Sequence, residues 1–244
     1  MSLPAEAAAA ADATGGGATA AFKVYARLIM ECEEEGIVPL RARIADSLGL
    51  SLPSVTGTAK RMREAGLIDF GAQRGVELRP AGRRLAIEML RKHRVAECFL
   101  AQTLGLDWAV AHAEADKWDR AMSDAAELRL RALLGDPAVS PYGNPIPRVG
   151  ETEWPLPAMR EATSLLHAAL AGSLTRHCRV LWLSEQLQGN AHVLTQLRRQ
   201  GLLPGSTLSF ELHGSSVLID EPQRQRTIEL PHGVAAGLFV DVIH

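Results

Sequence analysis

Three side chains that favour divalent metals lie close together in the middle of the sequence. His93 and Glu97 are four residues apart in an expected helix, so they project from one face of it. His112 lies near the start of the next expected helix. Nitrogen and oxygen donors of this kind suit iron, manganese, cobalt or zinc. The spacing predicts a metal cluster, although a His–Glu pair four apart also occurs as an ordinary hydrogen bond on a helix surface.

Helices with apolar stripes are expected to hold these residues. The periodicity predicts one long helix over residues 81–103, which stops near Gly105. A second helix is predicted from the N-cap Asp107 to about residue 122, and a third follows Ser123. Long helices of this kind commonly form a dimer platform, so we expect a homodimer.

A winged helix-turn-helix is predicted before these helices. Ser51 offers an N-cap just before Pro53, a residue that is tolerated in a first helical turn. Two short apolar runs flank the turn Gly71–Gly75 and indicate a β-hairpin wing. The expected elements are helices over 21–35, 40–48 and 51–65 and strands over 67–70 and 76–78.

This head carries residue types that contact nucleic acids. The third helix offers small hydroxyls and two cations, and the wing tip offers Arg74. Winged helices also serve as protein-interaction modules, which is the alternative. The candidate DNA-contacting residues are Arg41, Arg43, Ser51, Ser54, Thr56, Thr58, Lys60, Arg61 and Arg74.

The near-neutral total charge hides a segregation along the chain. The 244 residues carry 26 basic and 28 acidic side chains, a formal charge of −2. Residues 37–94 have a local balance of +7 and residues 95–136 a balance of −4. The basic part favours a polyanionic partner and the acidic part favours cations, although charged faces are often only solvated.

The C-terminal part changes character. Four prolines within residues 145–157 indicate a linker. Short strands separated by turns follow from about Ser164 and predict a small β-barrel. The strands are expected over 180–183, 207–212, 217–220, 227–230 and 238–243, with one helix over 191–200.

Composition excludes several classes of protein. Residues 1–21 are rich in alanine and glycine and are expected to form a flexible tail. The sequence has no 18-residue apolar window and no signal-like start, so neither a membrane span nor secretion is expected. Cys32, Cys98 and Cys178 match neither a disulfide framework nor a CxxC zinc pattern, which favours the cytoplasm.

Longer strings of residues resemble a known family. They are EEEGIVPLRARIADSLGLSLPSV in the head, RKHRVAECFLAQTLGLDW in the long helix, LLGDPAVSPYGNPIP after the helices, and WLSEQLQG, LLPG and ELPHG near the end. The chain resembles the iron-dependent repressors of the diphtheria-toxin-repressor type over about residues 22–244. This implies a mainly α fold with a small β domain: a winged-helix DNA-binding domain over 22–85, a helical dimerisation and metal domain over 86–147, a linker over 148–163, and an SH3-like barrel over 164–244.

The resemblance implies a five-ligand metal site, called ancillary in the family. It adds two donors from the barrel to the cluster above, so that the expected ligands are His93, Glu97, His112, Glu185 and Gln188. Family contacts to an anion beside this site match Arg94, Ser140 and Asn144. Iron or manganese is the expected metal, and cobalt, nickel or zinc could substitute.

The chain departs from the family at its second, activating metal site. The family's ligand positions there match Val24, Asp116, Asp119 and Arg120, of which only the two aspartates can ligate. We hypothesise that this site is metal-free, with the Arg120 guanidinium standing in for the cation, or has low affinity. The alternative is that Arg120 points to solvent.

The third helix of the head also departs from the family. Pro53 joins the residues that match family DNA contacts, but the glutamine that the family directs at bases is Gly57 here. A glycine has no side chain to bond a base edge. The operator is therefore expected to differ from the family's usual sequence or to be read by shape and phosphate contacts.

These observations predict a metal-dependent repressor, of iron- or manganese-uptake genes, that binds double-stranded operator DNA as a dimer. An alternative is a family paralogue that binds DNA without metal or in response to another ligand. A hydrolytic enzyme is disfavoured because five protein ligands leave little open coordination for water. The sequence also lacks a nucleophile–base constellation and a glycine-rich phosphate loop.

Overall fold

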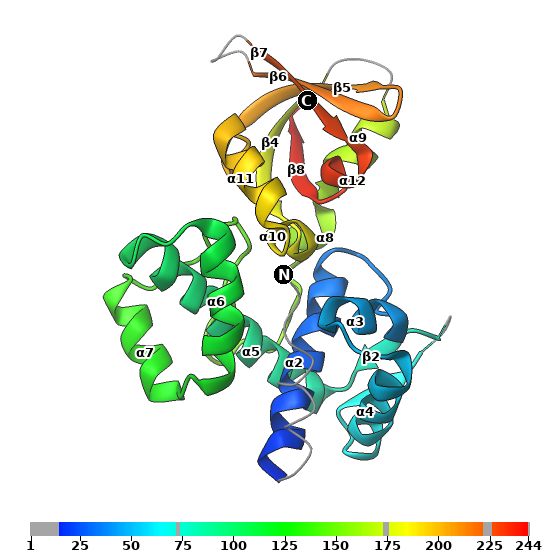
Figure 1. The fold of residues 1–244 in the computed structure, drawn as a ribbon, viewed down its shortest axis with the longest axis vertical. Helices are drawn as coiled ribbons and strands as arrows, with labels where there is room; N and C mark the ends of the chain where they lie inside the picture. Colours follow the sequence, from blue (N-terminus) through cyan, green and yellow to red (C-terminus); the bar gives the residue numbers. More distant parts are fainter. Residues whose placement is uncertain (1–14, 72–73, 173–175, 222–225, 244) are drawn as a thin grey trace. The chain divides into compact units, whose positions relative to one another are not determined.

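The chain forms a series of helices followed by an antiparallel sheet (Figure 1). The structure is a computed structural model, and it describes residues 15–71, 74–172, 176–221 and 226–243. Among these residues, no helix combines the length and the apolar character that crossing a bilayer requires.

The N-terminal part is a winged helix-turn-helix, as predicted. The Ser51 hydroxyl accepts a hydrogen bond from the Ser54 amide (3.4 Å) and starts the third helix, while Gly49, at a φ of 63°, ends the second. An isolated bridge between Leu40 and Gly75 ties the wing to the start of the second helix. The elements are α2 (Gly15–Glu34), α3 (Arg41–Leu48), α4 (Leu52–Glu64), β1 (Ile68–Phe70) and β2 (Val76–Leu78).

The first helix begins earlier than predicted. Helix α2 starts at Gly15, so residues 15–21 of the predicted tail are helical, and the remainder of that tail lies outside the described residues. Alanine has the highest helix propensity, so a helix that packs from Val24 onward extends back through Ala21, Ala20 and Ala18, whereas propensity does not account for its first three residues, which are glycines. The prediction of a flexible tail was wrong for this part because it considered only the missing apolar area.

The helices that carry the metal candidates follow directly after the wing. Helix α5 (Pro80–Cys98) continues into a π-helical turn, η3 (Phe99–Thr103), where the Leu104 amide donates to the Phe99 carbonyl (3.1 Å). The predicted single helix over 81–103 is therefore widened at its last turn. Helices α6 (Trp108–Ala121) and α7 (Asp124–Leu133) begin at the side-chain caps Asp107 and Ser123, as predicted.

A tight turn after α7 joins the helices to the sheet domain. Tyr142 is fully buried in the core of that domain, and its hydroxyl donates a hydrogen bond to the Trp108 carbonyl (2.5 Å). Gly143 has a φ of 88°, and a Cβ there would lie 2.1 Å from the Leu181 carbonyl oxygen, so only glycine fits. Burial raises the pKa of Tyr142, so its hydroxyl stays protonated.

The C-terminal domain is a six-stranded antiparallel sheet in the order β3-β8-β4-β5-β6-β7. The five predicted strands and the predicted helix α11 are present, whereas four short helices and strand β3 were not predicted because each is too brief to show a periodic pattern. The elements are α8 (Pro157–Glu161), β3 (Thr163–Ser164), α9 (Leu165–Leu170), β4 (Arg176–Leu183), α10 (Glu185–Gln188), α11 (Ala191–Gln200), β5 (Thr207–His213), β6 (Ser216–Glu221), β7 (Arg226–Pro231), α12 (His232–Ala235) and β8 (Leu238–Ile243).

The chain packs as two compact units. One comprises the described residues up to Lys92 together with Asp119–Ala121 and Pro147–Met159, and the other comprises the remainder. The first unit is therefore discontinuous in sequence. The division expected from the sequence, with a linker over 148–163, remains a prediction.

Part of the proline-rich segment packs against the winged head. Trp154 is 3% exposed, and its indole N–H donates to the Glu34 carboxylate (2.6 Å). Its backbone carbonyl accepts a hydrogen bond from Arg83 (2.6 Å), whose guanidinium also pairs with Glu33 (2.8 Å). The end of α2 and the start of α5 are thus joined through this tryptophan.

Replacing Trp154 by alanine is expected to lower the free energy of unfolding by about 3 to 5 kcal/mol, because a large buried side chain is removed. The Trp154→Phe variant keeps most of the ring packing and loses the bond to Glu34, so a smaller loss of about 1 to 3 kcal/mol is expected. Urea unfolding followed by circular dichroism measures both. Equal midpoints for wild type and the alanine variant would contradict this packing role.

Candidate metal centre and nucleic-acid interface

The three metal candidates on the helices come together in the structure. His93 and Glu97 lie on α5 and His112 on α6. The Glu97 Oε1 atom lies 3.0 Å from His93 Nε2 and 2.9 Å from His112 Nδ1. The two imidazole rings meet edge to face with centroids 5.2 Å apart. One carboxylate oxygen thus faces nitrogens from two helices inside a buried cluster.

The charge state of Glu97 suits a metal ligand. Burial alone would raise the pKa of this carboxyl group. The positive charge on His93 and the hydrogen bond from His112 outweigh that effect and lower the pKa of Glu97 to about 2. The group is therefore an anion at neutral pH, in the form that coordinates a cation.

The sheet domain supplies further donors to the same cluster. Ser184 caps the short helix α10, which carries Glu185 and Gln188. Ligand atoms of His93, His112 and Glu185 all lie within 4.8 Å of one another. Residues far apart in sequence thus form a set of nitrogen and oxygen donors that a divalent metal fits.

Gln188 has an unsatisfied buried oxygen. Its side chain is 1% exposed, and its Nε2 donates to Asn144 Oδ1 (3.0 Å) and to the Leu183 carbonyl (2.8 Å). Its Oε1 has no hydrogen-bond partner among the described residues. A buried polar atom left in this state costs about 1 to 3 kcal/mol. A metal ligated by this oxygen would remove that cost, so the residues present fit the group.

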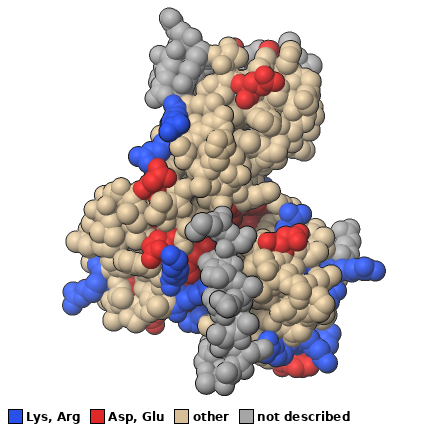
Figure 2. Space-filling view, viewed as in Figure 1, with Lys and Arg blue, Asp and Glu red and all other residues tan. Residues whose placement is uncertain are grey.

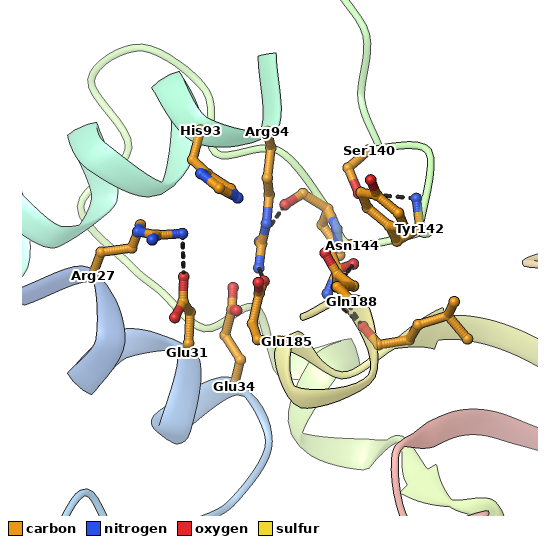
Figure 3. Close-up of polar contacts among 12 residues, drawn as sticks. Arg27, Glu31, Glu34, His93, Arg94, Ser140, Tyr142, Asn144, Glu185 and Gln188 are labelled. Atoms are coloured by element: carbon orange, nitrogen blue, oxygen red, sulfur yellow. Dashed lines mark hydrogen bonds and ion pairs between the residues drawn. The ribbon is translucent and has the colours of Figure 1, made fainter. Parts of the chain in front are cut away.

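One of the predicted anion contacts, Arg94, meets a carboxylate of the chain itself. Arg94 is fully buried, and its guanidinium donates to the Pro145 carbonyl (2.7 Å) and lies 3.3 Å from Glu185 Oε1 (Figure 3). The Ser140 amide donates to the Asn144 carbonyl (2.8 Å). Arg94 therefore orients the Glu185 carboxylate. Binding of an external anion by Arg94, Ser140 and Asn144 remains a prediction.

The second predicted site holds an internal cation from a different residue than expected. Arg120 is exposed, whereas the buried Arg27 of α2 places its Nε 3.6 Å from Asp119 Oδ2 and pairs with Glu31 (3.0 Å). The hypothesis that Arg120 stands in for the metal was wrong. Neighbouring helical residues point about 100° apart, so Arg120 faces outward when Asp119 faces the core.

The other positions of this second site differ in their ability to ligate a metal. Val24 is buried and apolar, and Asp116 Oδ1 lies 3.6 Å from His93 Nδ1. A valine offers no donor atom, and the Asp119 carboxylate is already beside a guanidinium. Binding of a second metal by Asp116 and Asp119 remains a prediction, because their carboxylate oxygens and a His93 nitrogen lie within 4.8 Å of one another. Arg27 lies off the apolar stripe that Tyr25, Leu28, Ile29 and Cys32 form, so the periodicity of the first helix carried no signal for its role.

The cysteines take no part in either site. Burial is the main cause that raises the pKa of Cys32, Cys98 and Cys178 to about 12. Each therefore remains a neutral thiol at neutral pH, whereas a metal ligand must be a thiolate. Among the described residues, the potential metal clusters contain histidine and carboxylates only.

The candidate DNA-contacting residues are mostly accessible. Lys and Arg side chains gather over α4 and beside the wing (Figure 2). Thr58 is the exception, because it is buried and its hydroxyl accepts a hydrogen bond from Arg61 (3.1 Å). It positions that guanidinium rather than meeting DNA itself. The exposed members are Arg43, Ser51, Pro53, Ser54, Lys60, Arg61 and Arg74, and Arg41 and Thr56 are partly exposed.

Gly57 is not required by the packing of α4. It is exposed, and a Cβ built on it would meet no atom within 4 Å. A larger side chain would therefore fit at this position. The missing glutamine is thus a difference in the surface that the helix presents and not a consequence of the fold.

Sequence comparisons match this chain to iron-dependent repressors and diphtheria toxin repressors. The signature described as "Iron dependent repressor, metal binding and dimerisation domain" matches residues 79–148. The chain is 38% identical over 223 residues to the iron-dependent repressor IdeR of Mycobacterium tuberculosis, and the match covers 91% of this chain and 96% of that protein. It is also 38% identical over 223 residues to the diphtheria toxin repressor of Corynebacterium efficiens, with 91% and 92% covered.

Comparison of structures agrees. A solved manganese-dependent transcriptional repressor in complex with manganese matches with a TM-score of 0.78 at 27% identity, covering 91% of this chain and 100% of that one. A solved ScaR structure with bound Zn2+ matches with a TM-score of 0.74 at 25% identity, covering 91% and 99%. The chain therefore belongs to the iron-dependent repressor family of metal-dependent transcriptional regulators.

Proposed function

We propose that this protein represses transcription by binding operator DNA as a homodimer when a divalent metal, Fe2+ or Mn2+, is bound. The observation that carries the proposal is the buried cluster of His93, Glu97, His112 and Glu185, with the unsatisfied Gln188 oxygen beside it. The five residues are its proposed ligands. Asp116 and Asp119 are proposed not to bind a second tight metal.

The proposed ligands come from elements that are far apart in the sequence. A bound divalent ion would supply positive charge here and would be coordinated by the nitrogen and oxygen atoms of these side chains. Glu185 and Gln188 are donors from the sheet domain, and the other three come from α5 and α6. Helix α5 starts directly after the wing and carries His93 and Glu97 near its end, so one continuous helix connects the wing to two of the proposed ligands.

The dimer is proposed to form through the helical region. Four large apolar side chains there are each more than half exposed in one chain, and a partner surface would bury them. The segment matched by the dimerisation signature contains them all. They are Leu104, Val110, Leu128 and Leu133.

The head is proposed to contact double-stranded DNA. Arg41, Arg43, Lys60, Arg61 and Arg74 supply phosphate-directed charge, so affinity should fall steeply with salt. Coupling between two ligands of one protein is reciprocal, so the factor by which metal raises the affinity for the operator is also the factor by which the operator raises the affinity for metal. The proposal places the protein in the cytoplasm and assigns it no enzymatic activity.

Selection of random duplexes by the purified protein tests this function. With Mn(II) present, we expect enrichment of a sequence with two-fold symmetry, bound by a dimer. With EDTA in place of Mn(II), we expect retention of that sequence to fall at least about tenfold, as a coupling of more than 1.4 kcal/mol requires. Equal binding in EDTA would contradict the proposal and favour a paralogue that does not need metal.

A further inference from the structure

Phe70 at the end of wing strand β1 lies beside two cations from different helices. The Arg63 guanidinium carbon, from the end of α4, lies 4.8 Å from the centroid of the Phe70 ring, and that of Arg41, from the start of α3, lies 5.2 Å from it. Both distances are within the range at which a cation over an aromatic face is attracted to it. One ring therefore receives a guanidinium from each helix of the helix-turn-helix.

The two guanidinium charges are only partly compensated among the described residues, by Asp69, whose pKa is lowered by the hydrogen bond from Arg79 and also by the charge of Arg63. Arg41 and Arg63 form no ion pair with a carboxylate among the described residues. The nearest acid in sequence, Asp69, is paired with Arg79 at 2.7 Å. Two like charges gathered at one ring repel each other, so the arrangement is favoured when an anion is bound between or beside them.

The geometry points to a clamp for a DNA backbone phosphate, in which Phe70 is a positioning residue that holds Arg41 and Arg63; this inference rests on the proposed function. A guanidinium that stacks on a ring by its face keeps its N–H edge available for phosphate oxygens. An arginine also has about three or four rotatable bonds to fix, and a ring that holds it in advance lowers the entropy lost on binding.

The clamp would compensate for a feature of α4. Gly57 presents no side chain to a base, so more of the affinity must come from phosphate contacts. Arg63 lies two residues beyond Arg61 on α4, and its contact with Phe70 of β1 places it beside the wing. Local spacing could not identify Arg63, because its partner ring belongs to another element.

The test uses the full-length protein with Mn(II) and the selected duplex, and measures affinity by fluorescence anisotropy from about 50 to 200 mM salt. The Phe70→Leu variant removes the ring and keeps an apolar strand residue. We expect its affinity to fall about fivefold and the slope of log affinity against log salt to decrease by about 1, as for one lost phosphate contact. The Phe70→Trp variant keeps an aromatic face and should restore both values.

Two further variants separate positioning from a general structural or charge effect. Arg63→Gln should reproduce the loss, and Phe70→Leu should cost less in the Arg63→Gln background than in wild type. The matched control is Arg84→Gln, which removes one exposed cation from α5 and should weaken binding less than Arg63→Gln.

The outcomes distinguish this inference from the proposed function. A wild-type protein that binds no duplex contradicts the proposed function itself. If wild type binds and Phe70→Leu leaves affinity and salt slope unchanged, the clamp is wrong. If Phe70→Leu markedly lowers the midpoint of thermal unfolding, the other two variants test the inference. An unchanged salt slope for Arg63→Gln would overturn it. A Phe70→Trp variant that does not restore affinity and salt slope would also overturn it.

Discussion

Replacing Glu97 by glutamine is expected to weaken binding of Mn(II) or Co(II) by at least about 100-fold, or about 2.8 kcal/mol. The reason is that Glu97 Oε1 faces both imidazoles of the cluster and supplies its buried negative charge. The amide keeps the volume and one oxygen but lacks the charge. Isothermal titration calorimetry measures the change, and wild type is expected to show one tight site per chain.

The matched control for this experiment is Glu114→Gln. Glu114 is also a carboxylate on these helices, but it lies outside the cluster and pairs with Lys117 (2.7 Å). Its variant is expected to bind metal with wild-type affinity. Unchanged binding by Glu97→Gln would show that the cluster is not the metal site, and two tight sites in wild type would contradict the single-site interpretation.

Replacing Arg27 by methionine is expected to lower the free energy of unfolding by about 3 to 5 kcal/mol, because breaking a buried ion pair leaves uncompensated charge. Arg27 is 5% exposed and contacts both Glu31 and Asp119. Without it, both buried carboxylates lose their contact with this cation. Guanidinium unfolding of the metal-free protein measures the change.

Arg120→Met provides the control, because Arg120 is the next residue along from Asp119 and is exposed. Its free energy of unfolding is expected to stay within about 0.5 kcal/mol of wild type. A second substitution, Asp119→Leu, in the Arg27→Met background should recover part of the loss by removing one of the two buried carboxylates that contacted Arg27. A larger loss in the free energy of unfolding for Arg120→Met than for Arg27→Met would contradict the assignment of Arg27 as the cation that pairs with Asp119.

Local signals in the sequence predicted the elements that have clear punctuation. Ser51, Gly49 and Asp107 mark helix ends through side-chain caps and a left-handed residue, and each lies where it was expected. Helix α5 was expected to place His93 and Glu97 on one face, and the structure does so because a four-residue spacing is a property of the helix alone.

Contacts between distant elements followed no local rule. Arg27 and Asp119 are brought together by the packing of two helices, and Arg63 meets Phe70 across an element boundary. Glu185 was expected near the cluster only through the family resemblance, because no spacing relates it to His93. Helix and strand periods describe one element at a time, so the partner of a buried charge depends on tertiary packing.

Trp154 has a consequence for the order in which the protein is made. A ribosome releases the winged head first, but this residue, which completes the packing of that head against Glu34 and Arg83, is added only after α5, α6 and α7. Nascent chains fold from the N-terminus as they emerge. The DNA-binding end of this protein therefore reaches its final packing only after α5, α6 and α7 have left the ribosome, so a nascent chain that ends before residue 154 has a head without this contact.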